Sequence, residues 1–99
     1  MLNIDKTIEN GKALFAPAGR LDTTTAPDFE KELKQSLGGV SELTLDFQGL
    51  EYISSAGLRV LLAAQKIMNQ QGSMKLKNVN ETILEIFEVT GFSDILTVE

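Results

Sequence analysis

Residues 43–62, LTLDFQGLEYISSAGLRVLL, decide the fold of this 99-residue chain. They read as a strand, a short turn, two adjacent serines and then a helix. The turn therefore delivers Ser54 and Ser55 to the point where a helix begins. There a hydroxyl can cap free backbone N–H groups, and a phosphate would meet the positive end of the helix dipole.

A serine at such a position can be a cap, a catalytic nucleophile or a phosphorylation switch. A catalytic serine needs a base, usually a histidine, and this chain contains none. A serine–lysine arrangement stays formally open, although neither serine starts an S-x-x-K motif and the G-x-S-x-G elbow is absent. The sequence therefore favours the cap and the switch, and predicts no enzyme.

The composition indicates one small domain spanning residues 1–99, with an ordinary 42% of hydrophobic residues. The net charge of −5 argues against binding to nucleic acid or to anionic membranes. No apolar run approaches the roughly 20 residues that span a bilayer, and the N-terminus has no signal-peptide pattern. Cysteine is absent, so we expect a cytoplasmic protein with no disulfide and no cysteine-based metal site.

The first 37 residues predict a hairpin followed by a helix. Alternating apolar residues predict a strand over 2–9, and Asn10-Gly11 is the strongest short signal for a hairpin turn. A second strand covers 12–16, and Pro17 places this strand at a sheet edge or marks its end. Thr25 is the expected N-cap of the first helix, with Asp28 in the capping-box position. Gly38-Gly39 ends that helix.

The rest of the chain alternates strands with helices. Strands are predicted over 42–47 and 74–78, with a helix over about 56–71 between them. Asn80 caps a third helix, and residues 95–98 form a last strand or terminal turn. Residues on the apolar faces of these elements should form the core: Phe29, Leu33, Leu45, Phe47, Leu61, Ile86 and Phe87.

This order predicts an α/β fold in which strands separated by helices pair in parallel through right-handed crossovers. The expected architecture is a mixed, mostly parallel sheet with an N-terminal β-hairpin and with helices packed on it. The helix over 56–71 carries more apolar residues than one core-facing stripe requires. We therefore expect it to be either sandwiched between layers or partly exposed for docking.

Three segments together resemble the STAS family, whose best-known small members are bacterial anti-sigma factor antagonists. They are Gly19-Arg20-Leu21-Asp22, the block LDFQGLEYISSAGLRVLL and the final EIFEVTGFSDIL. The resemblance covers nearly the whole chain, and it implies a STAS-like fold.

The resemblance also implies the site residues. In the family, a serine in a D-S-[ST]-G-L motif is phosphorylated, and alignment on Gly57-Leu58 puts Ser55 at that serine. Ser54 falls where the family has aspartate, and is left as a competing acceptor. Asp22, Thr23, Ser54, Gly57 and Leu58 are then the expected partner-binding residues; Asp22 could instead be a local cap for the turn that follows it.

The function implied by the resemblance is that of an anti-sigma factor antagonist. The unphosphorylated protein would bind a serine-kinase anti-sigma factor and free a sigma factor, and a phosphoserine phosphatase would reset it. ATP would belong to the kinase, so no cofactor is expected. Two alternatives stay open: a STAS interaction subunit of a membrane transporter such as a lipid-transport ATPase, and a small-ligand or nucleotide-binding domain, although no G-x-x-x-x-G-K-[ST] loop is present.

Overall fold

A computed structural model describes residues 2–99 of the chain. The elements in chain order are β1 (Leu2–Glu9), β2 (Lys12–Leu21), α1 (Ala26–Ser36), β3 (Glu42–Asp46), β4 (Leu50–Ile53), α2 (Ser55–Gln71), β5 (Ser73–Lys77), α3 (Glu81–Thr90) and the 3-10 turn η1 (Phe92–Asp94). The strand order is β1-β2-β3-β5, and β4 also pairs with β2. Among the described strands only β1 and β2 pair antiparallel, so the predicted mixed, mostly parallel sheet is confirmed.

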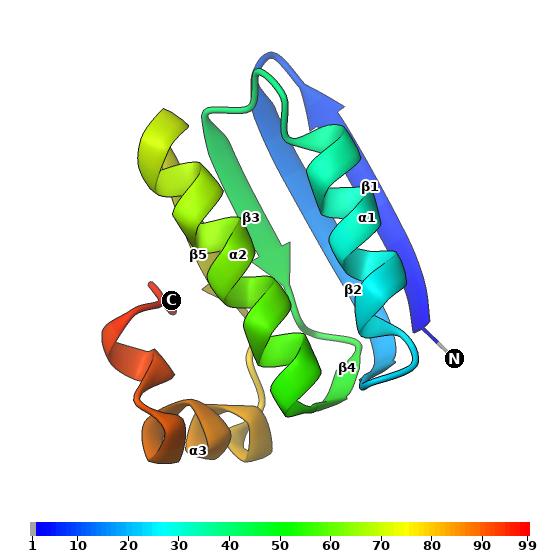
Figure 1. Cartoon of the computed structure of the whole chain (residues 1–99), viewed down its shortest axis with the longest axis vertical. Coiled ribbons are helices and arrows are strands. Elements are labelled where there is room, and N and C mark those ends of the chain that lie inside the picture. The colour runs from blue at the N-terminus through cyan, green and yellow to red at the C-terminus, as the bar shows by residue number, and fades with distance from the viewer. Residues whose placement is uncertain (1) are drawn as a thin grey trace.

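Helices α1 and α2 lie side by side over one face of the sheet, and α3 lies near the N-terminal end of α2 (Figure 1). The predicted hairpin is also confirmed, because Asn10 and Gly11 adopt positive φ values of 52° and 78° between β1 and β2. These are the dihedral angles that a two-residue hairpin turn of this kind requires. At the other end of the chain, the segment expected as a strand or turn makes a single parallel bridge between Val98 and Leu76 of β5.

The prediction that Pro17 lies at an edge or ends its strand is wrong. Strand β2 continues to Leu21 and lies inside the sheet, with β1 on one side and two strands on the other. Strand β3 pairs with β2 only as far as Phe15, and β4 takes over at Gly19, whose N–H donates to the carbonyl of Gly49 at 2.9 Å. Alternate N–H groups of a strand point to the same side, so the donor that Pro17 lacks falls in the gap between β3 and β4.

The core fills the space between the sheet and the two helices that cover it. Alternate residues of the strands point into this layer, and the rings of Phe15 and Phe29 meet edge to face with centroids 6.4 Å apart. Six of the seven expected core residues are buried, whereas Ile86 is only partly buried at the edge of the core. The described large apolar side chains that are exposed are Ile8, Leu84, Val89 and Ile95. None belongs to α2, although Leu62, Ala63 and Ile67 of this helix are only half-buried, so α2 is not sandwiched between two layers and keeps part of its apolar surface accessible.

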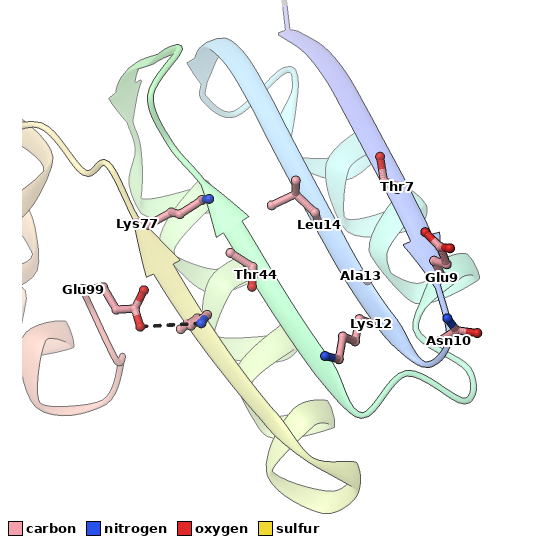
Figure 2. Close-up of a pocket in the computed structure, with 10 residues that line it drawn as sticks. Thr7, Glu9, Asn10, Lys12, Ala13, Leu14, Thr44, Lys77 and Glu99 are labelled. Carbon is pink, nitrogen blue, oxygen red and sulfur yellow. Dashed lines mark ion pairs between the residues drawn. The ribbon is translucent and has the colours of Figure 1, made fainter.

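The opposite face of the sheet carries no helix. Thr7, Leu14, Thr44 and Lys77 lie on this face, and a shallow depression of about 550 Å³ runs across it (Figure 2). Ion pairs between neighbouring strands or segments border the depression: Lys12 with Glu42 at 3.7 Å and Lys75 with Glu99 at 3.6 Å. The polar and charged side chains of this face explain why the strands alternate buried and accessible residues.

Candidate functional site at the ends of two parallel strands

The candidate site is built where β2 and β4 end side by side. The two strands are parallel, with Leu21 opposite Ile53. One residue later, the N–H of Ser54 donates to the carbonyl oxygen of Leu21 at 2.8 Å. This bond places the loop that leaves β2 directly beside the start of α2, so the structure brings Asp22 and Thr23 next to the serine pair as the sequence predicted. The strand that leads into the serines is β4, however, whereas the sequence predicts a turn there.

Ser54 and Ser55 occupy different positions at the start of α2. Ser54 is the N-cap, and its Oγ accepts a hydrogen bond from the N–H of Gly57 at 3.3 Å. Ser55 is the first helical residue and is exposed. Within residues 2–99 no side-chain hydrogen bond engages the Ser55 hydroxyl, and neither serine hydrogen-bonds to a lysine or carboxylate that could act as a base. The geometry therefore leaves the Ser55 hydroxyl accessible and uses the Ser54 hydroxyl within the fold.

Asp22 organises the loop on the other side of the site. Its Oδ1 accepts hydrogen bonds from the Thr24 hydroxyl at 2.8 Å, from the Thr24 N–H at 3.0 Å and from the Thr25 N–H at 3.1 Å. The Thr24 hydroxyl, with these N–H groups, lowers the pKa of Asp22 below its ordinary value. Asp22 is therefore a local cap for the turn, one of the two roles considered from the sequence, while part of its surface stays accessible.

The capping box predicted at the start of α1 is wrong. Thr25 holds the N-cap position but has a helical backbone, and its side chain makes no cap hydrogen bond. Its hydroxyl instead donates to the carbonyl of Arg20 at 2.9 Å and accepts from the N–H of Asp22 at 2.9 Å. The carbonyl of Asp22 accepts from Ala26 N–H at 2.8 Å. Asp22 and Thr25 together start the helix, and Asp28 has no part in the cap.

Gly57 and Leu58 face into the protein rather than toward solvent. A Cβ on Gly57 would lie 2.7 Å from Cγ1 of Ile53 and 2.9 Å from Cγ of Leu21. Only glycine therefore lets the first turn of α2 approach the ends of β2 and β4 this closely. Leu58 is 6% exposed, so its side chain offers little surface to a partner. Both residues hold Ser55 in place from beneath.

A groove of about 380 Å³ lies between the first turns of α1 and α2. Thr23, Glu30, Ala56 and Arg59 are among the residues that line it. Arg59 lies one helical turn after Ser55, is exposed, and has no salt bridge to any residue of the described range 2–99. Sequence reasoning missed the contribution of α1 to this groove, because only the packing of the two helices brings Glu30 opposite Arg59.

On the other face of the sheet, Arg20 and Tyr52 form a stacked pair at the end where β2 and β4 finish. The guanidinium carbon of Arg20 lies 4.4 Å from the centroid of the Tyr52 ring, and the two residues are direct neighbours on β2 and β4. This pair was also missed, since the pairing of β2 with β4 was not predicted. Within residues 2–99, no three histidine, cysteine, aspartate or glutamate side chains gather as metal ligands. None of the helices of residues 2–99 is long and apolar enough to cross a membrane.

The chain is similar along its whole length to regulatory proteins of bacteria. The Anti-sigma-B factor antagonist of Bacillus subtilis is 28% identical over 98 residues, which cover 98% of this chain and 90% of that protein. The protein BtrV of Bordetella bronchiseptica is 35% identical over 99 residues, covering 98% of this chain and 84% of BtrV.

Solved structures share the fold. The anti-sigma factor antagonist from Mycobacterium paratuberculosis superposes with a TM-score of 0.89 at 17% identity, covering 99% of this chain and 85% of the other. Unphosphorylated SpoIIAA, an anti-sigma factor antagonist, gives a TM-score of 0.84 at 15% identity, covering 98% and 88%. At these identities the likeness concerns the fold. The STAS domain family matches residues 3–99, and the chain therefore belongs to the STAS domain family.

Proposed function

We propose that this protein is an anti-sigma factor antagonist: it binds an anti-sigma factor and so frees a sigma factor. The observation that carries the proposal is the full-length similarity to the Anti-sigma-B factor antagonist of B. subtilis, combined with an accessible serine at the start of α2. The protein acts as one STAS domain of the cytoplasm that binds and releases a partner, without an enzymatic activity or a cofactor of its own.

The finer proposal is that the partner is a serine kinase, that it phosphorylates Ser55, and that a phosphatase resets the protein. Three features support Ser55 over Ser54 as the acceptor. Ser55 is exposed, its hydroxyl is not used by the fold, and Ser54 is occupied as the cap of Gly57. A kinase that modified Ser54 would have to break the cap first.

A phosphate on Ser55 suits the folded protein. Phosphoserine adds about −1.5 to −2 charges at neutral pH. The first N–H groups of a helix have no partner within the helix, and the first turn of α2 contains no acidic residue that would repel the phosphate. An anion there gains about 0.3–1 kcal/mol from the helix dipole. Arg59, one turn along the same face, adds a cation within reach of the modified side chain. The fold should therefore survive the modification.

A partner surface that receives the neutral hydroxyl would not tolerate the phosphate. Burying an unpaired dianion costs several kcal/mol, and every 1.4 kcal/mol weakens binding about tenfold. Phosphorylation then ends the association through local electrostatics, without refolding of the domain. The surface concerned is the Asp22–Thr25 loop, the groove between α1 and α2, and the exposed part of the residues around Ser55.

The acceptor is tested with the anti-sigma factor encoded in the same genome. The protein is incubated with that factor and ATP, and the site is found by peptide mapping. We expect one phosphate, on Ser55, which is lost in Ser55→Ala and kept in Ser54→Ala. Phosphate retained in Ser55→Ala would contradict the assignment, and no association with any anti-sigma factor would contradict the function. Co-purification with a transporter ATPase instead would favour the transporter-subunit alternative.

The switch is tested separately with Ser55→Asp. Circular dichroism should show a normal fold, and calorimetric titration should show weaker binding to the same factor than the parent protein. Ser55→Asn is the matched neutral control and should bind more tightly than Ser55→Asp. An unfolded Ser55→Asp, or one that binds as tightly as the parent, would refute the electrostatic mechanism.

A further inference from the structure

The net charge of the chain is concentrated at its C-terminal end. Residues 1–77 contain all nine lysines and arginines together with nine of the fourteen acidic residues, so this part of the chain is neutral. The other five acidic residues lie in residues 78–99, where no lysine or arginine occurs. The segment that forms α3, η1 and the C-terminal end of the chain therefore carries the whole net charge of −5.

Three of these acidic residues form a row on the outward side of α3. Ile83 and Phe87 are buried, so they mark the side of the helix that packs on the protein. An α-helix turns once in about 3.6 residues, which places Glu81, Glu85 and Glu88 together on the opposite side. All three glutamates are exposed. The outward face of α3 is therefore an acidic surface.

The same part of the molecule also exposes apolar side chains. Leu84 and Val89 border the row of glutamates on either side, and Ile95 follows η1. Their exposed fractions are 36%, 79% and 46%, and they are three of the four large apolar side chains that are exposed in residues 2–99. Apolar side chains that are exposed singly need no explanation, whereas three within residues 84–95, rimmed by charges, are typical of a protein-binding surface.

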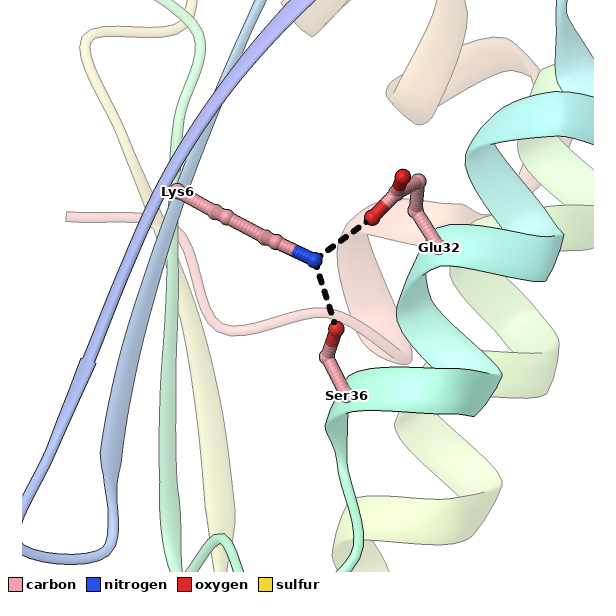
Figure 3. A network of polar contacts seen from close by, with 3 residues as sticks. All are labelled: Lys6, Glu32 and Ser36. Atoms are coloured by element: carbon pink, nitrogen blue, oxygen red, sulfur yellow. Dashed lines mark hydrogen bonds and ion pairs between the residues drawn. The ribbon is translucent and has the colours of Figure 1, made fainter.

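The fold does not use the acidic row. In α1, by contrast, Oε2 of Glu32 lies 2.7 Å from Nζ of Lys6, which also donates to Oγ of Ser36 at 3.2 Å (Figure 3). Among residues 2–99, Glu85 and Glu88 form no salt bridge. They repel each other across one turn, and the last turn of α3 contains no basic residue that would offset Glu88 at the negative end of the helix dipole. Both effects oppose the helix, so stability does not explain the row.

Helix α3 is held at the same end of the molecule as Ser55. It lies near the N-terminal end of α2 (Figure 1). Its N-cap residue, Asn80, donates from Nδ2 to the carbonyl oxygen of Leu50 at 3.0 Å, and Leu50 begins the strand β4 that leads into the serines. A protein partner that covers the start of α2 therefore has α3 beside it.

We propose that the outward face of α3, together with Ile95, is a second contact surface for the anti-sigma factor, occupied by a basic segment of that factor that also carries apolar side chains. The inference rests on the proposed function. Charge complementarity identifies the occupant, because an acidic surface repels nucleic acid and anionic membranes and attracts lysine and arginine. The charges should speed association, and the covered apolar side chains should slow dissociation.

The charges are tested by the kinetics of binding to the anti-sigma factor encoded in the same genome, measured by surface plasmon resonance at low and at high salt. The double variant Glu85→Gln/Glu88→Gln should associate at least about threefold more slowly than the parent at low salt, and the difference should vanish at high salt. Asp5→Asn/Glu9→Gln is the matched control, because it changes the net charge equally at exposed acids of β1. The control should change the association rate by less than about twofold.

The apolar contact is tested in the same experiment with Val89→Ser. This variant should dissociate about three- to tenfold faster than the parent at both salt concentrations, because an apolar side chain that the partner covers is lost. Ile8→Ser is the matched control, since it removes an exposed apolar side chain from β1, and it should dissociate at the rate of the parent. Circular dichroism should show that all four variants are folded.

The outcomes separate this surface from the proposed function. If Ser55→Asp weakens binding but Glu85→Gln/Glu88→Gln associates no more slowly than its control, the function stands and the surface on α3 is refuted. If Val89→Ser dissociates like the parent, the charges only steer the encounter and no partner is seated on α3. If the parent itself does not bind the anti-sigma factor, the proposed function fails and this surface fails with it.

Discussion

The backbone N–H of Ser54 donates to the carbonyl oxygen of Leu21 at 2.8 Å, and this single bond joins the two halves of the candidate site. It extends the pairing of β2 with β4 by one step past Ile53, so the loop of Asp22 and the first turn of α2 leave the same sheet edge together. Ligand sites of α/β sheets commonly form at such carboxyl ends. The sheet, rather than the loop, therefore fixes the position of Ser55.

Replacing Ser54 or Ser55 by alanine should change the free energy of unfolding by different amounts. Ser54→Ala removes the N-cap acceptor of Gly57 N–H, and loss of a serine cap costs about 0.5–2 kcal/mol. Ser55→Ala removes an exposed hydroxyl that the fold does not use and should change the free energy of unfolding by less than about 0.5 kcal/mol. Urea unfolding of both variants checks this. Equal losses, or a larger loss for Ser55→Ala, would mean that the roles of the two serines are reversed.

Most of the fold could be predicted from the chain, but β4 could not, and its geometry explains why. A strand is found in a sequence by alternation, in which every second residue is apolar. In β4 the buried residues are Leu50 and Ile53, three positions apart. The register with β2 shifts between Gly19 and Arg20, so the strand inserts an extra residue between its two inward positions. A four-residue strand with this irregularity carries no period-two signal.

The residues of the candidate site were predicted, but their contacts were not. The serine pair and Asp22 were found because Gly-Arg-Leu-Asp and the serine–glycine motif are local patterns. The local-cap role of Asp22 was considered from the sequence, but the part that Thr25 plays in its network was missed, because the spacing of Thr25 and Asp28 also fits a capping box. The choice depends on the path of the chain out of β2, where the Thr25 hydroxyl reaches back to the carbonyl of Arg20.

The burial of Phe47 gives a direct test of the core. Its side chain is 0% exposed, and its N–H donates to the carbonyl of Lys77 at 2.9 Å, just past the end of β3. Phe47→Ala should lower the free energy of unfolding by about 3–5 kcal/mol, a large part of the stability of a small domain. Ile8→Ala, at a site that is 45% exposed, is the control and should cost less than about 1 kcal/mol. A loss below about 1 kcal/mol for Phe47→Ala would show that the Phe47 side chain does not point into the core.

Asp22→Ala should lower the melting temperature as well as partner binding. If Asp22 served partner binding alone, this change would weaken binding while barely affecting the fold. The structure changes that expectation, because the carboxylate accepts hydrogen bonds from Thr24 and Thr25 at the start of α1. Thermal unfolding with calorimetry of binding checks both effects. Asp22→Asn, which keeps an acceptor oxygen, should melt closer to the parent; if Asp22→Ala melts like the parent, the capping network does not stabilise the loop.

The same network predicts that the stability of the fold falls at low pH. The pKa of Asp22 is lowered from its ordinary value near 3.8, chiefly by the Thr24 hydroxyl. A carboxylate whose folded pKa lies below its unfolded pKa stabilises the fold above the unfolded value. That stabilisation is lost as the pH falls through the folded pKa. The urea midpoint of the parent should therefore fall more steeply below about pH 4 than that of Asp22→Asn. Parallel curves would show that the carboxylate charge does not contribute.

Gly57 provides the last prediction, and it decides which variants can probe the interface. A new Cβ would lie 2.7 Å from Cγ1 of Ile53 and 2.9 Å from Cγ of Leu21, both in the packed layer beneath α2. Overpacking costs about 1–3 kcal/mol, against a gain of at most about 1 kcal/mol when a helical glycine is replaced. Gly57→Ala should therefore lower the free energy of unfolding by about 1–2 kcal/mol.

Gly38→Ala is the matched control, because no atom lies within 4 Å of its added Cβ and its φ is not positive. Its stability should match the parent within about 0.5 kcal/mol. A Gly57→Ala protein as stable as Gly38→Ala would mean that α2 can move away from the sheet, carrying Ser55 with it. If Gly57→Ala is destabilised as expected, then Gly57→Glu disrupts the fold before it reaches any partner. Loss of binding in that variant would then say nothing about the interface, and exposed neighbours such as Arg59 or Thr23 are the positions at which to test it.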